Sequence, residues 1–415
     1  MDFTLYVGRL INPGEEPLEG VRIRVLDGTI YSVQDQVIRR SGDVSIPSGV
    51  CSPALFNAHD HLKYTWPERV GRNGYPNSYE WLPTLYREAE SRFLNAISLE
   101  DLYWLGAYKS IFSGVTTVAN HCRPISPSFF SQFPIRILHA FRREIFVRED
   151  PRAHKMGLGA AEEARIAKRD RLPFVVHIAE GKDEKTAEEI DLLDSLGGLF
   201  DGSVLIHAIN VNERQIQKIA ASRCSVVWCP LSNEYLFDRT APIYSFISAG
   251  VNVALGTDST CSGGRDLLDE MRFASDELGG RPEDSARLLH SFCTVNGARA
   301  FGLPQLGKVA PGYAADLLAF ESCANDPFMD LLTVEPARMI FVLRDGRFLL
   351  RRCAMEIPTG CVIAESSVVE IEDLQFEIAG DPERILARVA RSSDRPLGAF
   401  PLGRIINLSA RPAFM

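Results

Sequence analysis

The 415-residue sequence has no uninterrupted apolar stretch long enough to cross a lipid bilayer. Its first residues lack the basic start and the apolar run of a secretory signal, so we expect a cytoplasmic protein. The sequence also has no basic excess. Its formal net charge is -9, which argues against nucleic-acid binding because phosphate groups require a basic surface. We therefore predict a small-molecule substrate, with no membrane and no nucleic-acid partner.

Two further motif classes are missing. The nine cysteines include no CxxC pair, so we expect reduced and mostly buried thiols rather than a disulfide scaffold or a zinc knuckle. No glycine-rich phosphate-binding motif follows an expected strand, which argues against a nucleotide-binding or dinucleotide-binding enzyme. The composition, with 46% hydrophobic and 24% charged residues, is that of an ordinary globular protein with room for a barrel and a smaller domain.

Short apolar runs broken by turns occupy both ends of the sequence. In residues 1–50, alternating runs flank Asp27-Gly28, which indicates a small antiparallel unit. The same pattern returns in residues 306–360, around Asp345-Gly346. We predict that these two segments together form one small β-sandwich. Residues 361–415 match no motif, and we expect a C-terminal extension with added strands or a terminal helix.

Between these segments, residues 51–305 alternate short β-branched strands with amphipathic helical stretches. This pattern predicts an α/β fold with a parallel sheet, and its length indicates a (β/α)8 barrel of the TIM type. Seven strands are clear, at residues 53–57, 115–119, 135–141, 173–177, 203–208, 225–229 and 251–256. The remaining strand must lie within residues 142–171, where only 144–147 offer one. The fourth strand is therefore expected to be short or missing.

Polar side chains end several of these strands at the same relative position. His59 and His61 follow the first strand, and alternate residues of an extended chain point to the same side, so both imidazoles converge. His177, His207 and Asp258 end three later strands. Each one alone is better explained as a core histidine or a capping aspartate. All five at the carboxyl ends of barrel strands, where barrel active sites lie, favour a metal centre.

Glu180 lies three residues after His177. A carboxylate beside a metal centre can carry a proton between water and a leaving nitrogen. The alternative is a glutamate that begins a helix and complements its dipole. The neighbouring metal-site residues favour the catalytic role.

These motifs, in this order, resemble the amidohydrolase superfamily, in the branch of the cytosine, guanine and adenosylhomocysteine deaminases and the triazine hydrolases. The matching segments are residues 53–62 (PALFNAHDHL), 114–118 (GVTTV), 177–180 (HIAE), 229–233 (CPLSN), 255–259 (LGTDS), 294–303 (TVNGARAFGL) and 307–317 (GKVAPGYAADL). These segments lie between residues 53 and 317, and the resemblance as a whole covers residues 1 to about 350.

The resemblance implies one divalent ion, Zn²⁺ or alternatively Fe²⁺, with four ligands: His59, His61, His177 and Asp258. Asp258 would also take a proton from the hydrolytic water, His207 would polarise the substrate, and Glu180 would protonate the leaving nitrogen. No lysine follows a strand where binuclear relatives carry a carbamylated lysine, so one ion is expected. Relatives are often dimers, which suggests a homodimer.

Four more residues are candidates for substrate contact: Trp81, His121, Ser232 and Asn233. Trp81 belongs to residues 63–92, an aromatic segment that we expect to overhang the site as a lid; a packed surface loop is the alternative. His121 follows the second strand. Ser232 and Asn233 would shape the pocket wall or support its ligands.

Charged side chains also follow the third strand, at Arg142, Arg143 and Glu144. An arginine there would meet an anionic group of a substrate. A solvated charge cluster is the more usual explanation, and it is the one we expect.

The motifs predict a hydrolase that attacks a carbon–nitrogen bond of a small cyclic molecule with metal-bound water, with deamination of a heterocycle as the main prediction. Ring opening of a cyclic amide uses the same chemistry and stays an alternative. An inactive barrel used for binding or assembly is an alternative of another class. The presence of all four ligands together with His207 and Glu180 argues against it.

Overall fold

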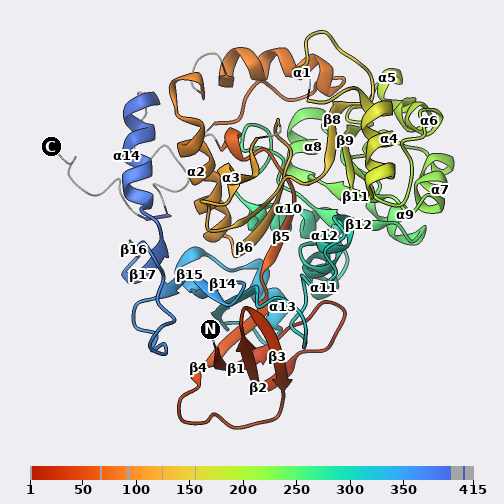
Figure 1. The fold of residues 1–415 in the computed structure, drawn as a ribbon. Coiled ribbons are helices and arrows are strands. Elements are labelled where there is room, and N and C mark those ends of the chain that lie inside the picture. Colours follow the sequence, from red (N-terminus) through yellow and green to blue (C-terminus); the bar gives the residue numbers. More distant parts are fainter. Residues whose placement is uncertain are drawn as a thin grey trace.

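The computed structural model describes residues 2–65, 68–90, 94–123, 125–154, 156–393 and 405–406. A barrel of eight short strands, surrounded by helices, lies on a sheet built from both chain ends (Figure 1). The barrel strands are β5 (Leu55–Asp60), β6 (Val115–Asn120), β7 (Arg136–Leu138), β8 (Arg142–Phe146), β9 (Phe174–Ile178), β10 (Ser203–His207), β11 (Ser225–Trp228) and β12 (Asn252–Leu255). The predicted fold class is confirmed.

Helices cover the barrel and its mouth. After β5 come η1 (Leu62–Tyr64), α1 (Ser78–Leu85), η2 (Tyr86–Glu90), η3 (Leu94–Ala96) and α2 (Leu99–Ile111), and after β6 comes α3 (Pro127–Phe130). The later helices are α4 (Ala160–Asp170), α5 (Glu184–Ala187), α6 (Glu189–Ser195), α7 (Glu213–Ala221), α8 (Pro230–Phe237), α9 (Ile243–Ser248), α10 (Leu267–Leu278), α11 (Pro282–Phe292) and α12 (Val295–Ala300). Several begin at side-chain caps, such as Asn212 of α7, which accepts a hydrogen bond from the Gln215 N–H.

The barrel strands pair in two parallel groups, β5-β6-β7 and β8-β9-β10-β11-β12. Between β12 and β5 the barrel closes just beyond the strand ends. There the N–H groups of Thr257 and Asp258 donate to the His59 carbonyl at 2.9 and 3.1 Å. This closure brings the first and last strands together at the edge where the predicted metal ligands lie.

The join between β7 and β8 departs from the regular barrel. β7 ends at Leu138 and β8 begins at Arg142, which leaves three residues, too few for a helical crossover. β7 pairs with β6, whereas β8 pairs with β9. The fourth strand is therefore present as the five-residue β8, and the helix that normally precedes it is absent from the described chain.

The Arg143 side chain fills this join. Its buried guanidinium donates to the carbonyl oxygens of Asn120 at 3.1 Å, Cys122 at 2.7 Å and His139 at 2.5 Å. The expected solvated charge cluster is thus wrong for Arg143, because the short link leaves backbone carbonyls that need an interior donor. Arg142 is part-exposed and pairs with Glu163 at 2.6 Å.

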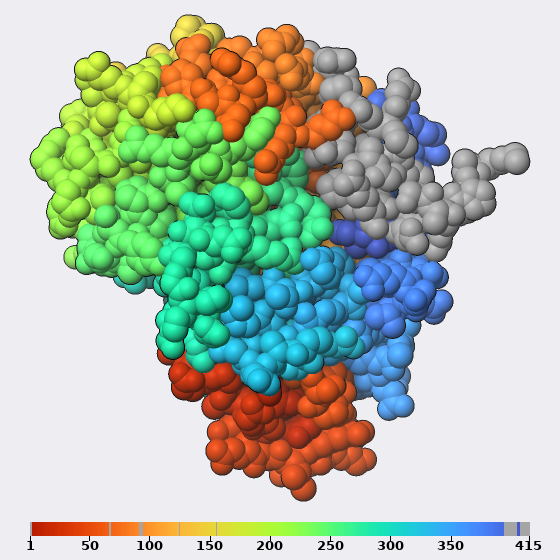
Figure 2. All heavy atoms as spheres, turned by 180° about the vertical axis from the view of Figure 1, so that it is seen from behind, coloured from red at the N-terminus to blue at the C-terminus, as the bar shows by residue number. Residues whose placement is uncertain are grey.

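Strands from both chain ends form one nine-stranded sheet in the order β16-β17-β15-β14-β13-β4-β1-β2-β3. The strands are β1 (Asp2–Leu10), β2 (Leu18–Leu26), β3 (Thr29–Gln34), β4 (Val44–Pro53), β13 (Leu317–Glu321), β14 (Met339–Arg344), β15 (Arg347–Arg352), β16 (Ser366–Ile371) and β17 (Leu374–Ala379). Figure 2 shows the N-terminal residues (red) directly beside residues of the C-terminal third (blue). Leu5 and Val25 share one buried cluster with Phe341 and Phe348, so the two halves pack as a single sandwich-like unit.

The C-terminal extension is placed on two neighbours. β16 and β17 add to one edge of the sheet, and α14 (Pro382–Ser393) packs against α2 of the barrel (Figure 1). An ion pair between Arg388 and Asp101 joins the two helices. Two further elements, α13 (Pro327–Leu332) and η4 (Pro336–Arg338), connect β13 to β14. Among the described residues, no helix combines the length and the apolar character that a membrane span requires.

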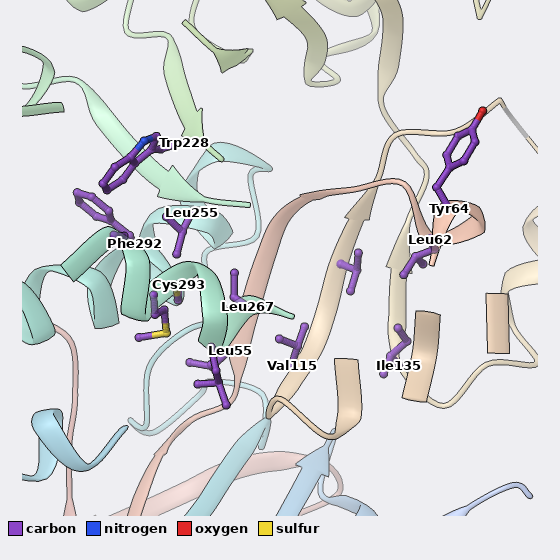
Figure 3. Close-up of a cluster of buried hydrophobic side chains, with 14 of the residues drawn as sticks. Leu55, Leu62, Tyr64, Val115, Ile135, Trp228, Leu255, Leu267, Phe292 and Cys293 are labelled. Atoms are coloured by element: carbon purple, nitrogen blue, oxygen red, sulfur yellow. The ribbon is translucent and has the colours of Figure 1, made fainter. Parts of the chain in front are cut away.

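The largest apolar cluster anchors the barrel strands to their helices. Leu55 of β5 and Val115 of β6 lie close together in it, with Leu255 of β12 and Phe292 of α11 (Figure 3). Burial of each such side chain contributes about 1.5–3 kcal/mol. These contacts fix the strands, and therefore the polar residues that follow them.

Candidate active site

Four predicted metal ligands converge at the carboxyl ends of β5, β9 and β12. One ligand atom from each of His59, His61, His177 and Asp258 lies within 4.8 Å of all the others. The Nε2 atom of His177 is 3.2 Å from Nε2 of His59 and 3.3 Å from Nε2 of His61. The Oδ1 atom of Asp258 is 3.7 and 3.4 Å from the same two Nε2 atoms.

This donor set fits a tetrahedral metal ion. Ligand nitrogens about 2.0–2.1 Å from a zinc ion would lie about 3.3 Å apart, close to the spacing found here. Burial lowers the pKa of His59 and of His61 to about 3, so both imidazoles are neutral at neutral pH and offer a lone pair. The Nδ1 atom of His177 donates to the Ile145 carbonyl at 2.9 Å, which leaves its Nε2 as a lone-pair donor. Three neutral imidazole nitrogens at this spacing are suited to binding one shared cation.

The backbone turns sharply where these strands end. Ala179, His207 and Asp258 have φ angles of 50°, 71° and 53°, in the left-handed region that non-glycine residues rarely adopt. All three follow or end a barrel strand at the same level. Such local strain, maintained by the surrounding structure, is typical of functional sites.

Asp60 lies between the two histidines and points to the opposite side of the strand. It is buried and accepts hydrogen bonds from Lys109 at 2.7 Å, Thr257 at 2.9 Å and Asn57 at 3.0 Å. Lys109 is itself buried on α2, so the pair is held in a low-dielectric interior where both charges need each other. Asp60 therefore fixes the backbone that carries both imidazoles.

Asp258 is held by two hydroxyl groups. Ser232 and Ser262 donate to its Oδ2 atom at 2.7 and 2.8 Å, which leaves Oδ1 facing the histidines. Although burial raises it, the hydrogen bond with His59 and the electrostatic interaction with the surrounding histidines hold the pKa of Asp258 well below its ordinary value. The side chain is therefore ionised and fixed in orientation.

His207 and Glu180 face each other beside this cluster. The Nδ1 atom of His207 donates to the Asn233 side-chain oxygen at 2.7 Å, so its Nε2 atom faces Glu180, 3.5 Å from Oε1. Burial, together with the charge of Asp258, raises the pKa of Glu180 well above its ordinary value. A carboxyl group that keeps its proton near neutral pH is suited to general-acid chemistry.

A pocket opens in front of these residues. His61, His177, Glu180 and Asp258 lie at its inner end. The rest of the lining comes mainly from residues after β5 and after β8: Lys63, Tyr64, Ser78, Trp81, Leu82, Leu85, Tyr86, Arg123, Ile145, Phe146, His154, Met156 and Ser259. A small molecule that enters the pocket meets the predicted metal ligands and Glu180 at its end.

Comparison with known proteins supports this picture. The amidohydrolase family matches residues 147–349. A 5-methylthioadenosine/S-adenosylhomocysteine deaminase from Desulfitobacterium hafniense is 29% identical over 365 residues, covering 76% of this chain and 80% of that protein. Together with the cluster of three histidines and one aspartate, these matches agree with the family that the motifs predict.

The chain is similar to the amidohydrolase superfamily, in its deaminase branch. Like its relatives, it is a metal-dependent hydrolase that acts on carbon–nitrogen bonds other than peptide bonds, with a small-molecule substrate.

Solved structures show how widely the fold is shared. The adenosine deaminase of Xanthomonas campestris, crystallised with bound zinc, superposes with a TM-score of 0.72 at 19% identity, covering 95% of this chain and 98% of that one. The zinc-bound atrazine chlorohydrolase of Arthrobacter aurescens TC1 gives a TM-score of 0.70 at 20% identity, covering 94% and 100%. At these identities the likeness establishes the fold of the present amidohydrolase.

The structure shows which of the four predicted substrate contacts of this amidohydrolase line the pocket. Trp81 lines the pocket from α1, and its indole N–H donates to the Val70 carbonyl at 3.0 Å. Ser232 and Asn233 lie behind the site and bind Asp258 and His207 instead of lining the pocket. Of the predicted overhanging segment, Trp66 and Arg92 lie outside the described residues.

His121 also lies behind the pocket wall. Its buried ring stacks on His177, with the centroids 4.6 Å apart and the planes 8° from parallel. Neither ring nitrogen has a hydrogen-bond partner among the described residues. His121 therefore supports the orientation of His177 by packing.

Three functional residues of the amidohydrolase were missed in the sequence. The role of Asp60 could have been found from strand alternation, because it lies between two ligands that share the other side. Lys109 and Ser262 gave no signal, since a lone lysine in a helix and a serine in a loop are common everywhere.

Proposed function

We propose that this amidohydrolase is a zinc-dependent aminohydrolase that replaces the exocyclic amino group of an adenine-type ring with oxygen. The relative from Desulfitobacterium hafniense is named for deamination of adenine nucleosides, and the Xanthomonas campestris neighbour is an adenosine deaminase. Among the described residues, the observation that carries the proposal is the placement of Glu180 and His207, 3.5 Å apart, beside the cluster of three histidines and one aspartate.

His59, His61, His177 and Asp258 would hold the ion. Three imidazole nitrogens and one carboxylate oxygen at near-tetrahedral spacing favour Zn²⁺ over Fe²⁺, which usually takes more ligands. When bound, the ion supplies Lewis acidity that brings the pKa of a bound water toward neutrality.

Asp258 accepts the proton of the attacking water. Its Oδ2 atom accepts from Ser232 and Ser262 and its Oδ1 atom faces the histidines, so the carboxylate is held beside the place where the water would be activated. The low pKa of Asp258 keeps it ionised, and its fixed orientation removes the cost of reorganisation during the reaction.

Glu180 delivers a proton to the nitrogen side of the substrate. Its raised pKa favours the protonated carboxyl group, which can donate to a ring or leaving nitrogen. His207 offers Nε2 at the same point and, when protonated, donates to the negative charge that develops there. Departure of the amino group as ammonia then completes an aminohydrolase reaction.

The test is to incubate zinc-loaded protein with adenosine, 5-methylthioadenosine and S-adenosylhomocysteine. Release of ammonia, with NH exchanged for O in the product mass, supports the proposal. Addition of the elements of water to a cyclic amide, with no ammonia from any heterocyclic amine, would replace deamination by ring opening.

A variant pair tests the proton role. Glu180→Gln is expected to lose turnover by at least about 10²-fold while zinc content is unchanged, because an amide cannot transfer the proton. Glu184→Gln, a substitution of a glutamate on the nearby α5, is the matched control. Near-normal turnover of zinc-loaded Glu180→Gln protein would contradict the proton role.

A further inference from the structure

The pocket continues well beyond the predicted metal ligands. One wall is apolar and is formed by Trp81, Leu82, Leu85, Ile145, Phe146 and Met156. A substrate that placed only a small ring at Glu180 would leave this wall without contact, so the pocket is built for a larger molecule.

Tyr64 connects the inner and the outer part of the pocket. Its ring centroid is 6.1 Å from that of His61, and its hydroxyl group donates to Glu90. In Figure 3 this hydroxyl points away from the buried cluster in which Leu62 lies. The Tyr64 side chain therefore lies between the predicted metal ligand His61 and Glu90, and we call the part of the pocket beside Glu90 its outer part.

The outer part is cationic. Two permanently charged basic side chains, Lys63 and Arg123, line the pocket together with His154, whereas its lining carboxylates are Glu180 and Asp258 beside the predicted metal ligands. This is unusual for a chain of net charge -9. A positive end on a negatively charged protein favours entry of an anionic group.

Glu90 neutralises only part of this positive charge. Its carboxylate accepts from Lys63 at 2.8 Å, from Tyr64, and from His154 at 2.9 Å. Although burial raises it, the hydrogen bonds from Lys63 and Tyr64 hold the pKa of Glu90 below its ordinary value, so it stays ionised and fully engaged.

Arg123 is left without a counter-charge. It follows β6 and lines the pocket, and it has no hydrogen bond or ion pair of its side chain within the described part of the chain. A guanidinium is a planar fork of donors that matches a carboxylate or a phosphate with two parallel hydrogen bonds.

We propose that the substrate carries an anionic group, a carboxylate or a phosphate, that binds to Arg123 while its amino-bearing ring lies at Glu180. The apolar wall covers the part of the substrate between the two ends. This inference rests on the proposed function, because deamination places the ring at the inner end. The relatives' names include an uncharged and a charged nucleoside, 5-methylthioadenosine and S-adenosylhomocysteine, and Arg123 favours the charged one.

The test compares charged and uncharged substrates with zinc-loaded protein. S-Adenosylhomocysteine against 5-methylthioadenosine tests a carboxylate, and adenosine 5′-monophosphate against adenosine tests a phosphate. We expect kcat/KM to be at least about ten-fold higher for one charged member than for its partner. Which pair shows the preference identifies the anion.

Arg123→Met is expected to lower kcat/KM for the preferred charged substrate by about 10–100-fold and for its uncharged partner by less than about three-fold. Arg152→Met is the matched control, because Arg152 is exposed in the loop after β8 and does not line the pocket. An equal loss on both substrates, or no loss on either, would overturn the role of Arg123.

A binding measurement separates this inference from deamination itself. Calorimetric titration of zinc-loaded protein with 3-phenylpropionate and with 3-phenylpropanamide needs no turnover. We expect the acid to bind at least about ten-fold more tightly than the amide in the wild type, and equally in Arg123→Met. If no purine is deaminated but this difference is found, the proposed function fails and the anion site stands. If the Arg123→Met variant also binds 3-phenylpropionate more tightly than 3-phenylpropanamide, the carboxylate binds the metal ion and not Arg123.

Discussion

The Glu189 carboxylate accepts a hydrogen bond from the backbone N–H of Ala179 at 2.7 Å, directly before Glu180. Its second oxygen accepts from the Tyr79 hydroxyl at 2.6 Å. Tyr79 lies on α1, the helix from which Trp81 lines the pocket. One buried carboxylate thus connects the proposed proton shuttle to the pocket wall.

Removal of this carboxylate should misplace Glu180. We predict that Glu189→Ala lowers kcat by about 10–100-fold with zinc content unchanged, because small displacements of catalytic groups cost this much. Glu189→Gln should retain most activity, since its amide can accept from Ala179 and donate to Tyr79. Steady-state kinetics and metal analysis of both variants test this. Glu188→Ala is the control, because Glu188 is an exposed neighbour of Glu189 that pairs with Arg148. Equal kcat for Glu189→Ala and the wild type would contradict the positioning role of Glu189.

The same carboxylate should make stability depend on pH. Burial raises the pKa of Glu189 from about 4.5 to about 7, so the folded state holds the proton more tightly than the unfolded chain. Unfolding then releases a proton, and the free energy of unfolding must fall as pH rises from about 4.5 to about 7. Burial also raises the pKa of Glu270, to about 8, in the same direction. The measurement is urea unfolding at about pH 5 and about pH 8. Between these two pH values, the free energy of unfolding should decrease less for Glu189→Gln than for the wild type. Equal decreases in the two proteins would contradict a raised pKa of Glu189.

The sequence was sufficient for the parts of the fold and site that follow strict local rules. Alternation along a strand put His59 and His61 on one side, and the apolar runs before His177 and Asp258 marked the strand ends. In a parallel barrel those ends meet at one edge, so the four residues had to approach one another. The structure brings them within 4.8 Å.

What the sequence could not supply depends on contacts between distant segments. Arg143 was expected in solvent, because the three-residue link that buries it becomes visible only when β7 and β8 are seen to pair with different neighbours. Ser232 and Asn233 were expected either at the pocket wall or in support of its ligands, and which of the two applies depends on where α8 packs relative to β10 and β12. Side-chain direction at the start of a helix is set by tertiary packing, not by the motif.

The join between β7 and β8 should depend strongly on Arg143. We predict that Arg143→Met lowers the free energy of unfolding by roughly 3 kcal/mol or more, because several buried carbonyls lose their donor. Arg143→Lys should cost less but still be destabilising, since an ammonium cannot reach the same set of oxygens. Arg142→Met, beside it but part-exposed, should cost less than about 1 kcal/mol. Urea unfolding of the three variants checks the order, and similar losses for Arg142→Met and Arg143→Met would contradict it.

Trp81 should contribute to the substrate's binding through its ring. We predict that Trp81→Ala lowers kcat/KM by roughly ten-fold or more, because it removes a large part of the apolar wall. Trp81→Phe keeps a ring but loses the hydrogen bond to the Val70 carbonyl, and should retain more activity. Kinetics with several heterocyclic amines test both variants. Unchanged kcat/KM and substrate range in Trp81→Ala would remove the proposed role of residues 63–92 as a lid.

The metal ligands should make the stability of the protein depend on the ion. The Nε2 atom of His177 lies 3.2 Å from that of His59 and 3.3 Å from that of His61, a spacing that a shared cation would bridge. Zinc at a hundred times its Kd should raise the free energy of unfolding by about 2.7 kcal/mol, and chelation should reverse this. His61→Ala is expected to abolish the zinc-dependent rise in Tm, because it removes one of the four ligands and leaves only three to bind the ion. His139→Ala changes a histidine outside the cluster and should keep the full rise. If zinc raises the Tm of His61→Ala as much as that of the wild type, the ion binds elsewhere and the four-ligand assignment is wrong.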